Sequence, residues 1–215
     1  MNIVEEVLEI TLRSLVVSGT ATLLASAWSL PLAYILAKPG RLRSLMASIL
    51  EALVGIPTVL LGLALYMLFS RSGILGFLHL LYTVRAIVVG QAILITPLIA
   101  VTACRVLKSA RESFEEMALA LGADDLQAMA IALREALPGI TSSVVMGFSR
   151  AVGELGIALM LGGNIRGTTR VLTTAIALSV SMGEYELALY LGGILVAISV
   201  LVSLTVRLLK GVQGL

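Results

Sequence analysis

Residues 108–138 read KSARESFEEMALALGADDLQAMAIALREALP and lie between two long apolar runs. Apolar side chains recur at intervals of three and four residues on both sides of Gly122, which is the spacing of one helix face. A glycine that follows a helix readily adopts the left-handed backbone that closes the last turn. Asp124 or Asp125 then offers a carboxylate to cap a second helix. The stretch therefore predicts two helices with a break at Gly122, lying at the membrane surface.

Each of the two predicted helices carries an apolar stripe. The stripes consist of Phe114, Met117 and Leu121, then Leu126, Met129, Leu133 and Leu137. Such a knob can seat in a groove on a cytoplasmic partner protein. The alternative is an amphipathic connector that lies on lipid. The acidic residues in the middle of the loop disfavour this alternative, because the cytoplasmic leaflet is itself anionic.

The rest of the chain is too apolar for a soluble protein. Of its 215 residues 59% are hydrophobic and 13% are charged, whereas roughly 25% of residues are charged in soluble domains. The formal net charge of +2 gives no reason to expect a nucleic-acid partner. The single cysteine, Cys104, excludes an internal disulfide, and the single histidine, His79, argues against a histidine metal site. No GxxxxGK[ST] phosphate loop occurs, so any ATP must be bound by another chain.

Five apolar segments are long enough to cross a bilayer, which takes about 20 residues in a helix. They are residues 14–37, 46–69, 86–107, 139–161 and 187–209. A further apolar segment, 172–182, is too short to cross and is typical of a re-entrant or interfacial piece. The acidic start of the chain lacks the basic region of a secretory signal peptide, so we expect none. The pattern predicts an all-α membrane protein with one transmembrane domain over residues 1–215.

The basic residues of the loops predict the orientation, because they gather on the cytoplasmic side. Nine lie on the side of the knob, namely Lys38, Arg41, Arg43, Arg105, Lys108, Arg111, Arg134, Arg207 and Lys210. Five lie on the other side, namely Arg13, Arg71, Arg85, Arg166 and Arg170. We therefore expect the N-terminus outside, the C-terminus inside, and the loop 108–138 in the cytoplasm.

Prolines fall inside three of the predicted spans, at Pro31, Pro57 and Pro97. A proline in a membrane helix frees a backbone carbonyl that neighbouring groups must satisfy. Ordinary kinking is the simplest interpretation at all three positions. Residues 55–58 read GIPT, and this cluster singles out Pro57 and Thr58 as candidates for a kink that shapes a gate.

Arg150 and Glu154 stand four residues apart inside the otherwise uncharged run 139–161. An unpaired charge at that depth costs roughly 2.5–3.5 kcal/mol on insertion scales, so the two side chains must pair on one helix face. One interpretation is that the pair fixes helix packing in the core or across a dimer interface. The other is that Arg150 lines the path of an anion. The glutamate weakens this second interpretation, because it largely cancels the attraction for a dianion.

Asn164, Arg166 and Arg170 follow the fourth span on the outer side. The two arginines can dock an acidic rim of a solute-binding protein or steer an anion toward the mouth. A solvated loop explains them equally well, with Asn164 building the turn.

The loop 108–138 resembles the EAA loop of ABC importer permeases, because Glu116-Met117-Ala118 is followed by Gly122. The resemblance implies the type I ABC importer permease fold and a loop that docks into the ATPase subunit. The residues that would carry this coupling are Glu116, Ala118, Gly122, Ala123 and Asp124. Two departures stand out: Met117 replaces the usual alanine, and Leu137-Pro138 comes three residues later than usual.

Two other stretches are similar to the oxyanion importers within that family. Residues 55–76, GIPTVLLGLALYMLFSRSGILG, resemble the second core span of molybdate- and tungstate-type permeases. Residues 149–178, SRAVGELGIALMLGGNIRGTTRVLTTAIAL, are the nearest match. The NIRGTTR continuation and LREA at 133–136 are similar to the tungstate branch. The likeness covers nearly the whole chain from about residue 11.

The resemblance implies a non-enzymatic permease subunit of a tungstate importer in the cell membrane. It implies two copies of this chain, two ATPase subunits and an extracytoplasmic oxyanion-binding protein. Because five helices are too few to enclose a translocation path, we predict a homodimer with the pathway at its two-fold axis. ATP and Mg would be held by the ATPase, and this chain would hold no cofactor and no metal. A molybdate or sulfate permease is the nearest alternative. A channel or secondary transporter without an ATPase is the alternative from another class.

Overall fold

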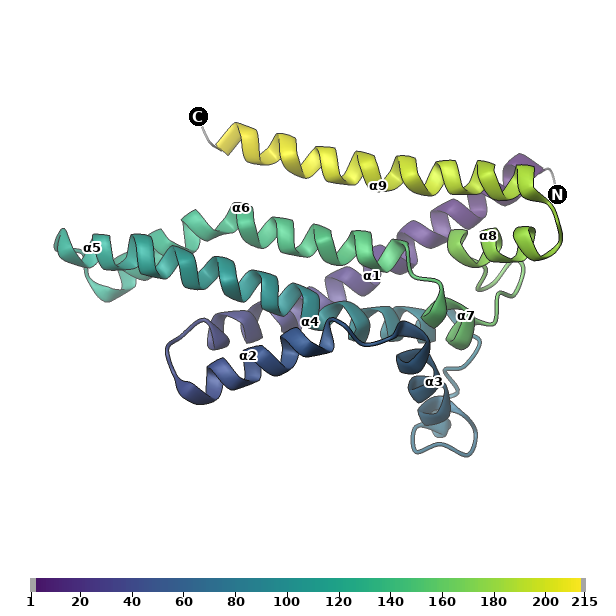
Figure 1. Ribbon diagram of the computed structural model, residues 1–215, viewed down its shortest axis with the longest axis horizontal. Coiled ribbons are helices and arrows are strands. Elements are labelled where there is room, and N and C mark those ends of the chain that lie inside the picture. The colour runs from purple at the N-terminus through teal and green to yellow at the C-terminus, as the bar shows by residue number, and fades with distance from the viewer. Residues whose placement is uncertain (1–2, 214–215) are drawn as a thin grey trace.

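The computed structural model describes residues 3–213, with side chains for residues 4–204, and within this part the regular structure is entirely helical (Figure 1). The longer helices are α1 (Ile3–Leu36), α2 (Arg41–Leu53), α3 (Thr58–Phe69), α4 (Val84–Ala110), α6 (Asp125–Val152), α8 (Leu172–Ser181) and α9 (Tyr185–Gln213). The short elements are η1 (Gly76–Leu78), the π-helical turn η2 (Arg111–Glu115), α5 (Glu116–Ala120) and α7 (Gly156–Gly162). The all-α prediction is therefore confirmed.

Four of the described helices are long and apolar enough to cross a membrane. They are α1, α6, α9 and the continuous helix Val84–Ala120, in which α4 runs through η2 into α5. The pair α2 and α3 makes a fifth span only when both are counted together, because they are bent by 99° at the break between them. The described chain thus holds four continuous candidate spans and one broken pair, although their bounds differ from those of the five predicted segments.

The centre of the fold is the packing of α4 between α1 and α6. Small residues dominate these contacts, notably Ala25 of α1, Ala92 of α4 and Ala151 of α6, which share one buried cluster. At Gly147 of α6 an added Cβ would lie 2.6 Å from the Ile99 side chain of α4. Small side chains let the backbones of membrane helices approach closely, which increases van der Waals contact between the helices. The other helices pack around this closely packed core of α1, α4 and α6.

Two of the predicted continuous helices are interrupted. The segment 46–69 breaks between Leu53 and Thr58, so that Pro57 caps α3 rather than kinking one helix. Pro31 and Pro97, in contrast, lie inside unbroken helices. A proline adjoining a glycine and a turn therefore breaks the helix, whereas an isolated proline does not.

The prediction of one helix over 139–161 is wrong, because α6 ends at Val152 and α7 begins at Gly156. In the other direction α6 begins at Asp125, so the second half of the loop 108–138 is continuous with the span that follows it. The two helices of the knob are therefore the extended ends of α4 and α6, and the knob is the tip of a long hairpin. Figure 1 shows this tip, at α5, protruding from one end of the molecule.

Candidate functional site

The two helix breaks, residues 54–57 and 153–155, lie against each other. An added Cβ on Gly156 would lie 3.1 Å from the Thr58 hydroxyl oxygen and 3.2 Å from Glu154 Oε1. At Gly62 of α3 an added Cβ would likewise lie 3.2 Å from the Met160 side chain of α7. Glycine at these positions is what allows α3 and α7 to pack this closely. The structure thus brings together Thr58 and Glu154, which are far apart in sequence.

Arg150 and Glu154 form an ion pair across the second break. Arg150 Nη1 lies 2.6 Å from Glu154 Oε2, with side-chain exposures of 41% for the arginine and 3% for the glutamate. The other carboxylate oxygen, Oε1, accepts a hydrogen bond of 3.2 Å from the backbone N–H of Ile157. Glu154 therefore lies in the break, where it satisfies a free N–H group of the first turn of α7. The pairing agrees with the four-residue spacing, but the two side chains do not share one helix face as predicted.

The backbone of this break finds its hydrogen-bond partners on other helices. Gln91 of α4 donates from Nε2 to the carbonyl of Ala151 at 3.0 Å, and Thr173 of α8 donates to the carbonyl of Glu154 at 2.9 Å. Ser18 of α1 in turn donates to Gln91 Oε1 at 3.3 Å. Irregular backbone at membrane depth is tolerated only where buried polar groups satisfy it in this way.

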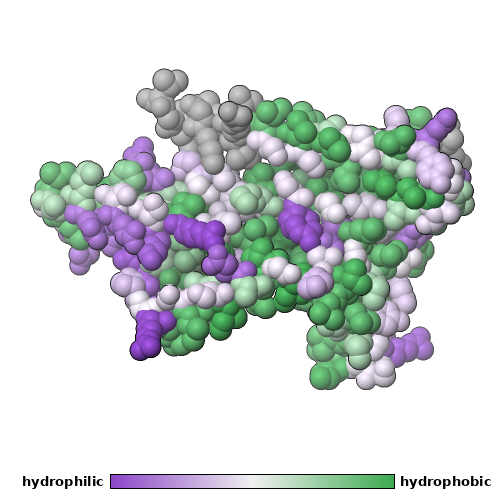
Figure 2. Space-filling view, in the orientation of Figure 1, coloured by the Kyte–Doolittle hydropathy of each residue, from purple (hydrophilic) through white to green (hydrophobic). Residues whose placement is uncertain are grey.

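Arg150 is the one charged residue between Ala136 and Gly153, and its exposed edge lies on an otherwise apolar part of α6. A charged group at this depth does not face lipid; it faces a partner helix or water. Figure 2 shows a hydrophilic patch isolated within the apolar middle of the molecule, between α6 and α3. The arrangement supplies a positive charge and a hydroxyl, and has no nucleophile–base pair for bond chemistry. Within the described residues no group of three His, Cys, Asp or Glu side chains gathers to hold a metal ion.

The knob is closed by hydrogen bonds at Gly122, which has a φ of +92°. The Ala123 N–H donates to the Ala118 carbonyl and the Gly122 N–H donates to the Leu119 carbonyl, both at 3.0 Å. This pair of bonds is a Schellman motif with Gly122 at the left-handed position. Asp124 then caps α6: its carboxylate accepts from the Gln127 N–H at 2.8 Å, and the Gln127 side-chain oxygen accepts from the Asp124 N–H. The predicted glycine break is confirmed, and the cap is Asp124 rather than Asp125.

The apolar residues of the knob point outward. Leu121 is 83% exposed and Leu126 is 71% exposed, while the buried positions of the hairpin are small residues such as Ala118, Ala128 and Ala132. Alanines let the two arms lie close together, and the larger side chains remain available to a partner. Figure 2 shows the result as a hydrophobic tip over α5 with a hydrophilic band behind it.

The predicted outer residues form a cluster with the start of α1. Glu6 accepts from Arg166 Nε at 2.8 Å and lies 3.3 Å from Arg170 Nη1. Arg170 also donates to Asn164 Oδ1 at 3.3 Å, and Asn164 has a φ of +51°. The hydrogen bond that the Arg166 guanidinium donates to the Glu6 carboxylate raises the pKa of Arg166 above its ordinary value. The positive charge of both arginines is therefore shared with a carboxylate of the same chain.

Sequence reasoning missed the polar partners of the site. Gln91 was detectable as the single amide in the apolar run of α4, and a buried amide needs hydrogen-bond partners. Thr173 and Ser18 carry no such signal, because hydroxyls are common in membrane helices and bond to their own backbone. Glu6 was counted only as part of an acidic start, and its pairing with Arg166 joins residues 160 positions apart.

Comparison with known proteins adds sequence relationships to this geometry. The family model described as binding-protein-dependent transport system inner membrane component matches residues 29–211. The tungstate uptake system permease protein TupB of Peptoclostridium acidaminophilum is 40% identical over 195 residues, which cover 90% of this chain and 86% of that protein. A probable anion ABC transporter permease protein of Haloferax volcanii is 33% identical over 88% of this chain and 84% of its own length. The molybdenum transport system permease protein ModB of Mycobacterium tuberculosis is 31% identical over 91% and 76%.

Proposed function

The chain belongs to the family of binding-protein-dependent transport system inner membrane components, and from this premise we propose that it is the permease subunit of an ATP-driven tungstate importer. We propose tungstate as the substrate because the chain is 40% identical, over 90% of its length, to a protein named as a tungstate uptake permease. The site fits a transport role, because it offers an arginine between two broken helices and no set of groups for bond chemistry. ATP and Mg belong to a separate ATPase subunit in this proposal.

The knob is the proposed contact with that ATPase. Its exposed tip at Leu121 and Leu126 fits the insertion of a short helix into a groove. Because its arms are the ends of α4 and α6, a push on Gly122 is transmitted along both helices. Glu116, Ala118, Ala123 and Asp124 form or flank this tip. The knob thus couples ATP-driven closure of the ATPases to rocking of the spans between inward- and outward-facing states.

The proposed assembly contains two copies of this chain and two ATPase subunits, with an extracytoplasmic oxyanion-binding protein on the outer side. Four long helices and one broken pair are too few to enclose a pathway alone, so the pathway lies at the two-fold axis between copies. The N-terminus is outside and the C-terminus inside, as the basic loop residues predict. Asn164, Arg166 and Arg170 then stand at the outer mouth, where the binding protein would dock.

Within this assembly we assign different roles to the two members of the intramembrane pair. Glu154 is buried, caps α7 and holds the break in place. The Arg150 side chain is 41% exposed and pairs with Glu154, which lies beside Gly156 where Thr58 of α3 approaches. Glu154 is therefore a packing residue, and Arg150 lines the path next to the bend between α2 and α3.

A molybdate or sulfate permease is the second candidate, because a molybdenum permease is 31% identical to this chain. Selectivity among these oxyanions would lie mainly in the binding protein. A channel or secondary transporter is the candidate from another class, and it has no need of the closed, apolar-tipped knob.

The experiment that separates these classes is co-purification with the ATPase subunit of the same importer. We expect Gly122→Asp to abolish co-purification, because it strains the left-handed position and puts a charge at the apolar tip. Gly183→Asp is the matched control: Gly183 has a φ of +78° and open space around it, as Gly122 has, but lies in the turn between α8 and α9. Equal co-purification of both variants, or none by the wild type, would refute the coupling role.

A further inference from the structure

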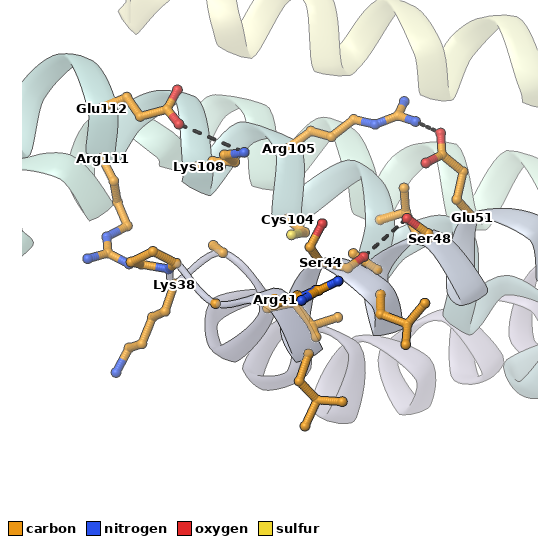
Figure 3. A pocket seen from close by; sticks show the side chains of 18 of the residues that line it. Lys38, Arg41, Ser44, Ser48, Glu51, Cys104, Arg105, Lys108, Arg111 and Glu112 are labelled. Carbon is orange, nitrogen blue, oxygen red and sulfur yellow. Dashed lines mark hydrogen bonds and ion pairs between the residues drawn. The ribbon is translucent and has the colours of Figure 1, made fainter.

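A cavity of about 1460 Å³ lies between α2, the end of α1 and the end of α4 nearest the knob (Figure 3). Five cationic side chains line it, namely Lys38, Arg41, Arg105, Lys108 and Arg111. Four carboxylates line it as well, so the cavity carries an excess of positive charge. In the proposed orientation it opens toward the cytoplasm.

Three of the cations form ion pairs with carboxylates that also line the cavity. The pairs are Arg105 with Glu51, Lys108 with Glu112 at 3.9 Å, and Arg111 with Glu115 at 2.7 Å. The last two pairs join residues four apart on one helix. The pair of Arg105 and Glu51 instead crosses the cavity from α4 to α2, as Figure 3 shows.

The two remaining cations lie on the α1–α2 side of the cavity. The Lys38 ammonium lies 5.0 Å from the centre of the Tyr34 ring, which is a cation–π contact. Among the residues whose side chains the structure describes, neither Lys38 nor Arg41 has a carboxylate partner. Lys38 is near enough to Glu115 to help lower the pKa of that carboxyl, so its charge is partly compensated. Five cations against four carboxylates still leave the cavity with one net positive charge.

The helix α2 is held weakly in this position. None of its residues is buried, and at Leu53 it ends at the 99° break before α3. The pair of Arg105 and Glu51 is the only ion pair between α2 and the rest of the described chain. Its side chains are 63% and 56% exposed, so both charges are accessible to ions that enter the cavity. Exposed pairs of this kind contribute little and exchange readily.

We infer that this cavity is the exit vestibule for the transported oxyanion, in which Arg105 exchanges the Glu51 carboxylate for a divalent oxyanion. The inference rests on the function proposed above and gives each copy of the chain its own cytoplasmic exit from the path at the two-fold axis. When the oxyanion takes the place of the carboxylate, α2 loses its only ion pair to α4 and is free to move at the break. Arrival of the cargo thereby loosens the helix that covers its exit.

The chemistry of the site suits a cargo that must leave again. The planar fork of Arg105 matches two oxygens of an oxyanion, as it matches a carboxylate. Arg41 and Lys38 line the same cavity and add to its positive charge. Competition by Glu51 keeps the affinity low, and a transport site must bind strongly enough to admit the ion and weakly enough to release it.

The test measures ATP-dependent tungstate uptake into liposomes that hold the complete importer, with tungstate preloaded in the lumen on the cytoplasmic side. In Glu51→Gln, Arg105 has no competing carboxylate, so the lumenal concentration that halves uptake should fall about two- to fivefold. In Arg105→Gln that concentration should rise, and Arg105→Lys should restore part of the effect. Arg43→Gln is the matched control, because Arg43 is on α2 but lies outside the cavity lining and donates to the Pro39 carbonyl at 3.0 Å.

A second measurement does not require turnover. Ser44 lines the cavity and is exposed, so a Ser44→Cys variant in a Cys104→Ala background reports access to it. Tungstate should slow alkylation of this cysteine, and adding Arg105→Gln should remove that protection.

The outcomes separate the two levels of the proposal. Absence of ATP-dependent uptake by the wild type would overturn the proposed function itself. Normal wild-type uptake, with Glu51→Gln and Arg105→Gln behaving like Arg43→Gln, would overturn the exit vestibule alone. The assay is repeated in phosphatidylcholine vesicles with and without phosphatidylglycerol. Differences among variants that appear only with phosphatidylglycerol would assign the cavity to a lipid phosphate and overturn the inference.

Discussion

Arg150–Glu154 and Arg105–Glu51 are two arginine–glutamate pairs of this protein whose surroundings differ sharply. Glu154 is 3% exposed and also accepts from the Ile157 N–H, so this carboxylate is part of the packed core although its partner Arg150 is 41% exposed. The Arg105–Glu51 pair has both members more than half exposed and joins α4 to a helix without buried residues. The same chemistry is therefore structural at the α6–α7 break and exchangeable in the cavity. The difference lies in desolvation and in the additional partners of each carboxylate, not in the residues themselves.

The largest expected effect comes from breaking the half-buried pair. Arg150→Gln leaves the buried Glu154 carboxylate without its counter-ion but with its hydrogen bond from the Ile157 N–H, and we expect the stability to fall by about 2–3 kcal/mol. The measurement is unfolding of the purified chain in detergent by increasing dodecyl sulfate. Arg105→Gln is the control that removes the equivalent arginine from the exposed pair. Equal stability of the two variants would contradict the contrast between the pairs.

A smaller effect is expected when the support of the break is removed. Gln91→Leu keeps the approximate volume but removes the donor to the Ala151 carbonyl and the acceptor for Ser18. We expect a loss of about 1–2 kcal/mol in the same unfolding assay. Gln127→Leu is a comparison at the knob, where the amide is exposed and bonds only within its own capping box. A smaller loss for Gln91→Leu than for Gln127→Leu would show that the break does not depend on the network.

The smallest effect on stability is expected at the exposed pair. Glu51→Gln should change the free energy of unfolding by less than about 1 kcal/mol, because both side chains are hydrated in the folded state. The unfolding assay should therefore place this variant near the wild type even where its tungstate inhibition differs. A stability loss as large as that of Arg150→Gln would mean that this ion pair holds α2 firmly in place and does not exchange.

Features that depend on nearby residues could be predicted from the sequence, whereas features that depend on contacts between helices could not. Gly122 and Asp124 act within a few residues of chain, and the left-handed closure and the cap both follow from local residue types. The all-helical fold and the apolar segments follow from composition in the same way. The break at 153–155 was missed because an apolar run with paired charges reads as a helix, while the partners that stabilise its end, Gln91 and Thr173, come from other helices.

Sequence spacing predicted the ion-pair partners of only some of the charged residues. Spacing of four residues correctly paired Arg150 with Glu154, although across a break. Arg166 with Glu6 and Arg105 with Glu51 are non-local pairs that no periodicity indicates. The right-angled bend at Pro57 was indicated by the cluster GIPT, but its size depends on the packing of α3 against α7.

The most direct test of the central claim is ATP-dependent uptake of tungstate, molybdate and sulfate, offered separately to liposomes that contain this chain with its ATPase and binding protein. We predict uptake that requires ATP and occurs at far lower concentrations of tungstate than of the other two oxyanions. Equal uptake of molybdate would leave an ATP-driven oxyanion permease but contradict the tungstate assignment. Uptake without ATP or without the ATPase would contradict the account of the knob and of the transporter class.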